Sequence, residues 1–117
     1  MAKITIMVRS AQYGMATAGE GFRAIIGTAG MGFDTYAVLI DDGVFVALKD
    51  QNAEKIEMHN LAEAYKQISD FGAHLIIHKE SMEKRGISEY EIIAGKIVDT
   101  KELKNILRES KFVISFI

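Results

Sequence analysis

The fold is decided by one stretch of the sequence, TYAVLI, which runs from Thr35 to Ile40. After its first residue the stretch is apolar or aromatic, so a strand formed here has no polar face to turn to water. Near-continuous apolar runs of this kind are typical of parallel strands that are covered on both faces. The stretch FVISFI, from Phe112 to Ile117, has nearly the same character. Both stretches therefore predict buried strands of a parallel sheet.

Three further apolar stretches predict the remaining strands. In the first of them Ile4, Ile6 and Val8 alternate with other side chains, which is the period of a strand. These three strands are expected at Lys3–Arg9, His74–His78 and Lys96–Val98.

Helical patterns lie between the strands. Apolar residues spaced by three and four form one stripe from Met15 to Ala29, and this helix should end at the turn Gly30–Gly32. A second helix is expected from Asn60, its N-cap, to a stop at Gly72.

Three more helical segments are expected nearer the C-terminus. One follows Asp99 or Thr100 and carries apolar residues at helical spacing. A short turn is predicted at Ser81–Arg85 with Ser81 as its N-cap, and a short helix at Ser88–Ala94.

Strands that alternate with helices predict the α/β class. With right-handed crossovers, the expected fold is a three-layer, flavodoxin-like (Rossmann-like) domain with a mainly parallel sheet of about five strands. Ligands of such sheets bind beyond the carboxyl ends of the strands. The loops at those ends should be Ser10–Gly14, Asp41–Gly43, His78–Ser81 and Asp99–Thr100.

The composition limits the classes of function. The chain has 117 residues, of which 49% are apolar and 26% charged, which suits a single domain at 1–117. The net charge is −2, and no Lys/Arg cluster is longer than two, so nucleic acid is not an expected partner. The apolar run Ile4–Val8 is too short for a signal peptide or a membrane span. The expected location is the cytoplasm, away from any membrane.

The sequence contains no cysteine, so it offers no disulfide, no thiolate nucleophile and no cysteine-type zinc site. His74 and His78 share one face of a strand but would lie about 13 Å apart, at roughly 3.3 Å per residue, too far to bind one ion together. His59 precedes a helix cap and is interpreted as a surface residue. Neither a metal nor a cofactor is expected.

A possible dinucleotide motif, G-x-G-x-x-A, occurs at Gly19–Ala24, with Asp41 at a distance that suits a ribose contact. The true fingerprint places its first glycine in the turn directly after the first strand. Here the glycines fall inside a helical pattern. Close packing of this helix is therefore the favoured interpretation.

His78 is the most interesting titratable residue, because it should lie where the third strand opens into a ligand-side loop. It could exchange protons near neutral pH or donate a hydrogen bond to an anion. The alternative, which is favoured, is that it merely caps the strand end beside Ser81. Asp41-Asp42-Gly43 could hold a cation or activate water, but the pattern is also ordinary turn chemistry, and a turn is favoured.

The loop Ser10-Ala11-Gln12-Tyr13-Gly14 leads into the first helix, whose N-terminal N–H groups could hold an anion. By position it is the first candidate for a small-ligand contact. The candidate ligand- or partner-binding residues are therefore Ser10, Gln12, Tyr13, Gly14, Asp42, Gly43, His78 and Ser81.

With its loops in this order, the sequence resembles the DsrE/DsrF-like family, and within it the TusC/DsrF branch of sulfur-relay subunits. The resemblance runs nearly end to end. The segments that carry it are the first strand with the Ser10–Gly14 loop, DGVFVALKDQ at 42–51, SMEKRGI at 81–87 and SKFVISF at 110–116.

This resemblance implies a flavodoxin-like domain that works as an oligomer, alone or beside DsrE-like and DsrH-like subunits. Sulfur-carrying members of the family have a cysteine around the end of the third strand. The matching position here is His78, or within a residue or two of it. Persulfide carriage needs an ionisable thiol, which this chain lacks.

The favoured hypothesis is a non-catalytic subunit, structural or regulatory, of a sulfur-relay assembly. The alternative is a module that binds an anion or a nucleotide at the carboxyl ends of the strands. A third hypothesis, an enzyme with His78 and Asp42 as acid and base, is less favoured, and no catalytic residue is assigned.

Overall fold

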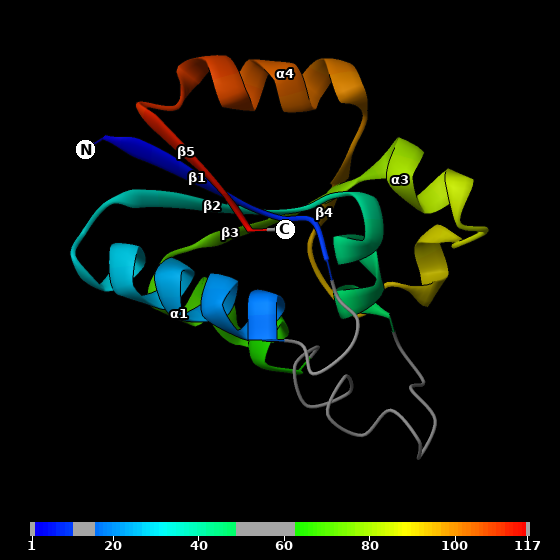
Figure 1. Cartoon of the computed structure of the whole chain (residues 1–117), viewed down its shortest axis with the longest axis horizontal. Helices are drawn as coiled ribbons and strands as arrows, with labels where there is room; N and C mark the ends of the chain where they lie inside the picture. Colours follow the sequence, from blue (N-terminus) through cyan, green and yellow to red (C-terminus); the bar gives the residue numbers. More distant parts are fainter. Residues whose placement is uncertain (1, 11–15, 49–62, 117) are drawn as a thin grey trace.

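The computed structural model describes residues 2–10, 16–48 and 63–116, with the backbone alone for 16–18. Its centre is a five-stranded sheet in the order β4-β3-β2-β1-β5, and every neighbouring pair is parallel (Figure 1). The strands are β1 Lys3–Val8, β2 Asp34–Leu39, β3 His74–His78, β4 Lys96–Val98 and β5 Phe112–Phe116. The predicted α/β class with a flavodoxin-like, mainly parallel sheet is confirmed.

Helical segments cover both faces of this sheet (Figure 1). On one face lie α1 Ala16–Gly30 and two 3₁₀ helices, η1 Asp41–Ala47 and η3 Gln67–Phe71. The larger core forms there, and its fully buried side chains include Ile6, Ile25, Leu39, Tyr65 and Ile77.

In the described part of the chain, one helix covers the opposite face, α4 Thr100–Glu109, over a smaller core with Val38, Ile76, Val98 and Leu103. The Asp99 side chain accepts a hydrogen bond of 2.8 Å from the N–H of Glu102, which confirms the predicted start of this helix. Because a ten-residue helix is narrower than a five-stranded sheet, part of this face has less cover.

Several helical predictions need correction. Residues 63–66 are α-helical, but the segment continues as η3 in 3₁₀ form to a left-handed Gly72, and the predicted cap Asn60 lies outside the described residues. The helix predicted at Ser88–Ala94 is only the 3₁₀ turn η4, Glu89–Glu91. Its capping box forms as expected, but Ile92 then bridges to Leu48, which ends the helix.

The N-cap predicted at Ser81 is wrong. The helix α3 begins two residues earlier, at Lys79–Lys84, with His78 in the N-cap position. Ser81 therefore lies inside the helix, where its hydroxyl is free to bond to side chains and loops above the strand ends.

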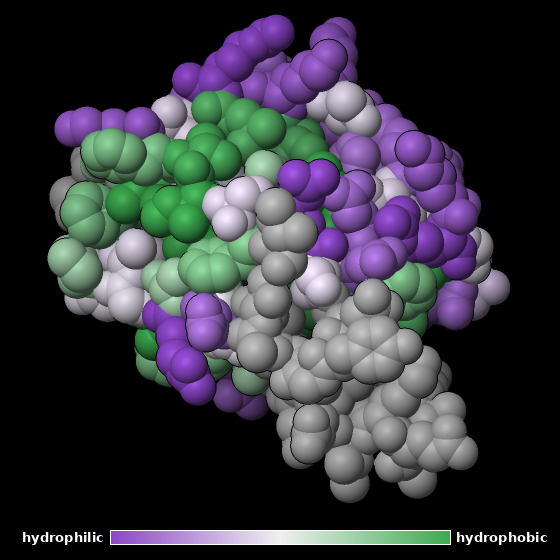
Figure 2. Space-filling model, viewed as in Figure 1, coloured by the Kyte–Doolittle hydropathy of each residue, from purple (hydrophilic) through white to green (hydrophobic). Residues whose placement is uncertain are grey.

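The predicted burial of the last apolar stretch is also wrong. Phe112, Val113 and Ile114 remain 57%, 45% and 43% exposed. Their strand, β5, lies at the edge of the sheet, and among the described strands only β1 lies beside it. Helix α1 contacts this strand, and Phe116 packs against the larger core. Figure 2 shows hydrophobic surface gathered where Figure 1 places β5. The result is an apolar strand edge open to solvent.

The packing interpretation of the G-x-G-x-x-A motif holds for its second glycine. Gly21 lies within α1, and a Cβ added there would come within 2.8 Å of Val8 Cγ2 and 3.3 Å of the Tyr65 hydroxyl. Gly19 faces open space. The motif is therefore not in the turn after β1, where a dinucleotide fingerprint would have to be. Among the described helices, none has both the length and the apolar character needed to cross a membrane.

Candidate functional site

The carboxyl ends of β1, β2 and β3 meet at one edge of the sheet, and η1 lies tightly against it. The N–H of Ile40 donates to the carbonyl of Val8 at 3.1 Å. Gly43 then packs so closely on β1 that any Cβ at this position would overlap with the Val8 carbonyl oxygen. The glycine predicted in a turn is thus required by a close backbone contact.

His78, the last residue of β3, is the centre of a hydrogen-bond network and is only 9% exposed. Its Nδ1 lies 2.7 Å from Ser81 Oγ, and its Nε2 lies 2.8 Å from Thr100 Oγ1. Glu80 Oε1 is 3.5 Å from the same Nε2. The ring therefore joins the start of α3 to the start of α4.

Hydrogen bonds within the chain engage both nitrogens of this ring. Ser81 Oγ, which bonds to Nδ1 of His78, also accepts the backbone N–H of Asp41 at 2.9 Å. The Thr100 hydroxyl is the partner of Nε2. A ring held in this way is poorly placed to act as a base on an external substrate.

Glu80 completes the network on its outer side. The backbone N–H of Thr100 donates to Glu80 Oε2 at 3.0 Å. This hydrogen bond to the charged form is the main reason that the pKa of Glu80 lies below its ordinary value, with further contributions from the Thr100 hydroxyl and His78. Because Thr100 is the first residue of α4, the carboxylate also lies at that helix's positive end.

The two neighbouring acids of η1 are each paired with an arginine. Asp41 Oδ2 accepts from Arg9 Nε at 2.9 Å, and Asp42 Oδ1 accepts from Arg85 Nε at 2.9 Å. Arg85 also donates to the carbonyl of Ser81 at 3.2 Å. These pairs favour the turn interpretation of the acids. Across the described residues, no group of three or more His, Cys, Asp or Glu could hold a metal ion.

The structure therefore brings some of the candidate residues together and separates others. Asp42, Gly43, His78 and Ser81 lie at the carboxyl edge, linked through η1 and α3, and Ser10 follows β1 at the same edge. Gln12, Tyr13 and Gly14 lie outside the described residues. The acid–base pair proposed for an enzyme is not assembled in the described part of the chain: Asp42 bonds to Arg85, while His78 bonds to Ser81 and Thr100.

Sequence reasoning missed Glu80 and Thr100 as partners of His78. Thr100 could have been found, because the loop Asp99–Thr100 was expected at the same edge of the sheet. Ser81 follows His78 by three residues, and a helix that starts at the strand end turns it toward the ring. Glu80 reaches the ring at the start of α4, where it accepts the N–H of Thr100.

The fold and this edge define a class: a flavodoxin-like α/β domain whose strand ends are closed by a buried histidine network and which has no thiol. The sequence profile of the DsrE/DsrF-like family matches residues 2–116. The chain belongs to this family, as its resemblance implied.

Similar proteins share nearly the whole length of the chain. The intracellular sulfur oxidation protein DsrF of Allochromatium vinosum is 23% identical over 130 residues, covering 97% of this chain and 96% of that protein. A TusC homolog of Vibrio vulnificus is 27% identical over 118 residues, covering 99% and 100%. The crystal structure of the E. coli YchN protein superposes with a TM-score of 0.79 at 23% identity, covering 99% of this chain and all of YchN.

Proposed function

We propose that this chain is a non-catalytic subunit, structural or regulatory, of a cytoplasmic assembly for intracellular sulfur transfer or oxidation. The names of the related DsrF and TusC proteins support the pathway. The single observation that supports the non-catalytic role is that both ring nitrogens of His78 form hydrogen bonds within the chain. By the family resemblance, His78 lies at or near the position where sulfur-carrying relatives have cysteine.

The chemical argument rests on sulfur. A persulfide forms on an ionised thiolate, and no residue of this chain provides one. Methionine, present six times, has no ionisable sulfur and cannot take its place. The chain therefore contributes surfaces and stability to the assembly, while a cysteine-bearing partner carries the sulfur.

The expected partners are DsrE-like and DsrH-like subunits, or further copies of this chain. The exposed edge of β5 supports association, because unpaired apolar strand edges are normally covered in soluble proteins. We assign a second partner-binding surface to the carboxyl edge, with the candidate residues Ser10, Gln12, Tyr13, Gly14, Asp42, Gly43, His78 and Ser81.

A small-ligand module remains the second candidate. It is favoured by Arg9, which follows β1 at the carboxyl edge and has 44% of its side chain exposed. Among the described groups, its ion-pair partner is Asp41, which is 43% exposed. An anion at this edge could compete for that guanidinium.

The test is a sulfur-transfer assay with intact-mass detection. The purified chain is incubated with a cysteine persulfide donor, alone and with a cysteine-bearing DsrE-like relative. We expect added sulfur on the relative and none on this chain, together with a native complex of the two. Covalent sulfur on this chain would refute the proposal. Absence of any complex with relatives or with itself would refute the subunit role.

A further inference from the structure

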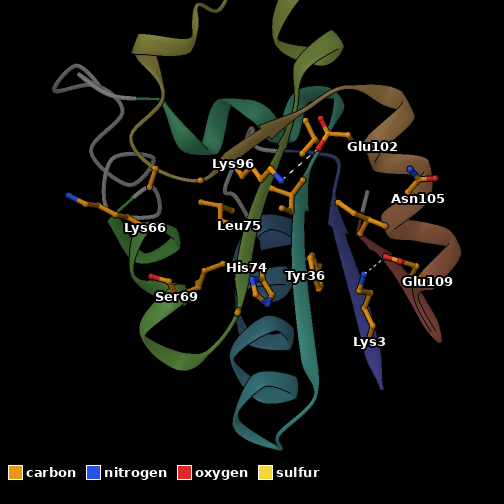
Figure 3. Close-up of a pocket in the computed structure, with 17 residues that line it drawn as sticks. Lys3, Tyr36, Lys66, Ser69, His74, Leu75, Lys96, Glu102, Asn105 and Glu109 are labelled. Atoms are coloured by element: carbon orange, nitrogen blue, oxygen red, sulfur yellow. Dashed lines mark hydrogen bonds and ion pairs between the residues drawn. The ribbon is translucent and has the colours of Figure 1, made fainter. Parts of the chain in front are cut away.

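A cavity of about 570 Å³ lies at the β3–β4 edge of the sheet, bounded by η3 on one face and by α4, which covers its face incompletely, on the other (Figure 3). It exists because β4 has only three residues: its register with β3 begins at Ile76, so no described strand lies beside His74 and Leu75 at that edge. The volume falls within the range of small-molecule sites, which is roughly 300–1,000 Å³. The cavity is distinct from the carboxyl edge, because it reaches the first residues of β1 and β3.

Three side chains on this face form a row across the sheet. The rings of Tyr36 and His74 stack with their centroids 4.4 Å apart and their planes 26° from parallel. On the other side of Tyr36, Lys3 Nζ lies 4.4 Å from the ring centroid. Asp34 holds His74 through its Nε2 at 3.1 Å. The row therefore ends at the ring of His74, whose side chain is about half exposed. Tyr36 stacks on one face of this ring and does not occupy the other.

The lysine side chains around the cavity differ in how closely they are paired with carboxylates. Lys3 is well satisfied, since its Nζ lies 2.8 Å from Glu109 and its side chain is only 15% exposed. Lys96 is paired weakly: its Nζ lies 3.8 Å from Glu102, and both side chains are more than half exposed. Such a pair contributes little, so a stronger anion can replace Glu102. Lys66 also borders the cavity, but its side chain points away from His74 and Lys96 (Figure 3).

We propose that this cavity binds a small planar aromatic anion, with its ring stacked on His74 and its carboxylate or phosphate at Lys96. The ring extends the row of Lys3, Tyr36 and His74 by one member. The wall behind it is apolar, with Ile76, Val98 and Ile106. Both parts of the ligand are needed, because the apolar wall and the stacked rings favour an aromatic ring and the weakly paired Lys96 favours a negative charge.

The test is a titration of the ¹⁵N-labelled chain with adenosine monophosphate, followed by amide NMR shifts. Adenosine, which lacks the anion, and inorganic phosphate, which lacks the ring, are the ligand controls. We expect saturable shifts at Tyr36, His74 and Lys96, and affinities roughly tenfold lower for each control ligand. His74→Ala and Lys96→Gln should each weaken binding by roughly tenfold as well.

Lys101→Gln is the matched control, since it removes an exposed lysine of α4 that does not line the cavity. It should bind like the unmodified chain. Lys96→Gln alters a side chain that is 71% exposed, so it tests the site even if His74→Ala perturbs the fold. The proposal is overturned by no saturable shift at millimolar ligand, by shifts centred on His78 and Thr100, or by unchanged affinity in folded Lys96→Gln.

Discussion

The Nδ1 atom of His78 and the hydroxyl oxygen of Ser81 lie 2.7 Å apart, and both residues are buried. The same hydroxyl accepts the N–H of Asp41 from the neighbouring η1 segment. One serine therefore links the end of β3 to the segment after β2. The carboxyl end of β3 is therefore occupied by an internal bridge.

Replacing Ser81 by alanine should destabilise the chain. The change leaves a buried imidazole nitrogen and a buried backbone N–H without their partner, which costs about 2–3 kcal/mol. Urea denaturation followed by circular dichroism measures the loss. Lys79→Ala, on the exposed side of the same helix, is the control and should change stability by less than about 0.5 kcal/mol. Equal stability of the two variants would show that the bridge is not structural.

The stability of the chain should fall in acid in part because of Glu80. Its pKa is lowered in the folded chain, so the stabilisation is fully present above its unfolded pKa, near 4.5, and is lost as the pH falls through the folded value. Glu80→Gln should lower stability at pH 7 and weaken the dependence on pH below about 4.5. Glu83→Gln, on the exposed face of α3, should keep the unmodified profile. Identical acid profiles for Glu80→Gln and the unmodified chain would contradict this assignment.

The strands were predictable because their signal is local. Burial on both faces requires runs such as TYAVLI, and β2 lies within one residue of the predicted range. The stops at Gly30 and Gly72 were equally local, since each marks the end of a helical pattern. The exposure of β5 was not predictable in this way. An apolar run reads the same whether the strand lies inside the sheet or at its edge, and only the strand order decides which.

The partners of His78 were hidden for a related reason. Ser81 lies on the next turn of the chain, but Thr100 is 22 residues away and Asp41 is 40 residues from Ser81. Their meeting depends on β2, β3 and β4 being neighbours in the sheet. The sequence predicted that these loops lie at one edge of the sheet. It could not show which of their side chains would form hydrogen bonds with each other.

Gly43 should tolerate no side chain. A Cβ at this position overlaps with the backbone of β1, so Gly43→Ala forces η1 away from the sheet, with an expected cost of about 3 kcal/mol. Gly19→Ala is the matched control, because it adds the same methyl group in α1 with nothing within 4 Å. The control should be neutral or stabilising by about 0.5–1 kcal/mol, since alanine favours a helix interior. Thermal or urea unfolding of both variants is the measurement, and similar values would contradict the close contact.

Covering the edge of β5 should drive association of the chain. Val113 is 45% exposed on a strand with one free edge, so Val113→Lys adds a charge where a partner strand would pair, with little cost to the isolated chain. We expect sedimentation to show an oligomer for the unmodified chain at micromolar concentration and a smaller species for the variant. Tyr90→Lys, at a 79% exposed position outside the sheet, should leave the oligomer intact. An unmodified chain that sediments as a single copy, or a variant that assembles equally well, would exclude β5 as the interface.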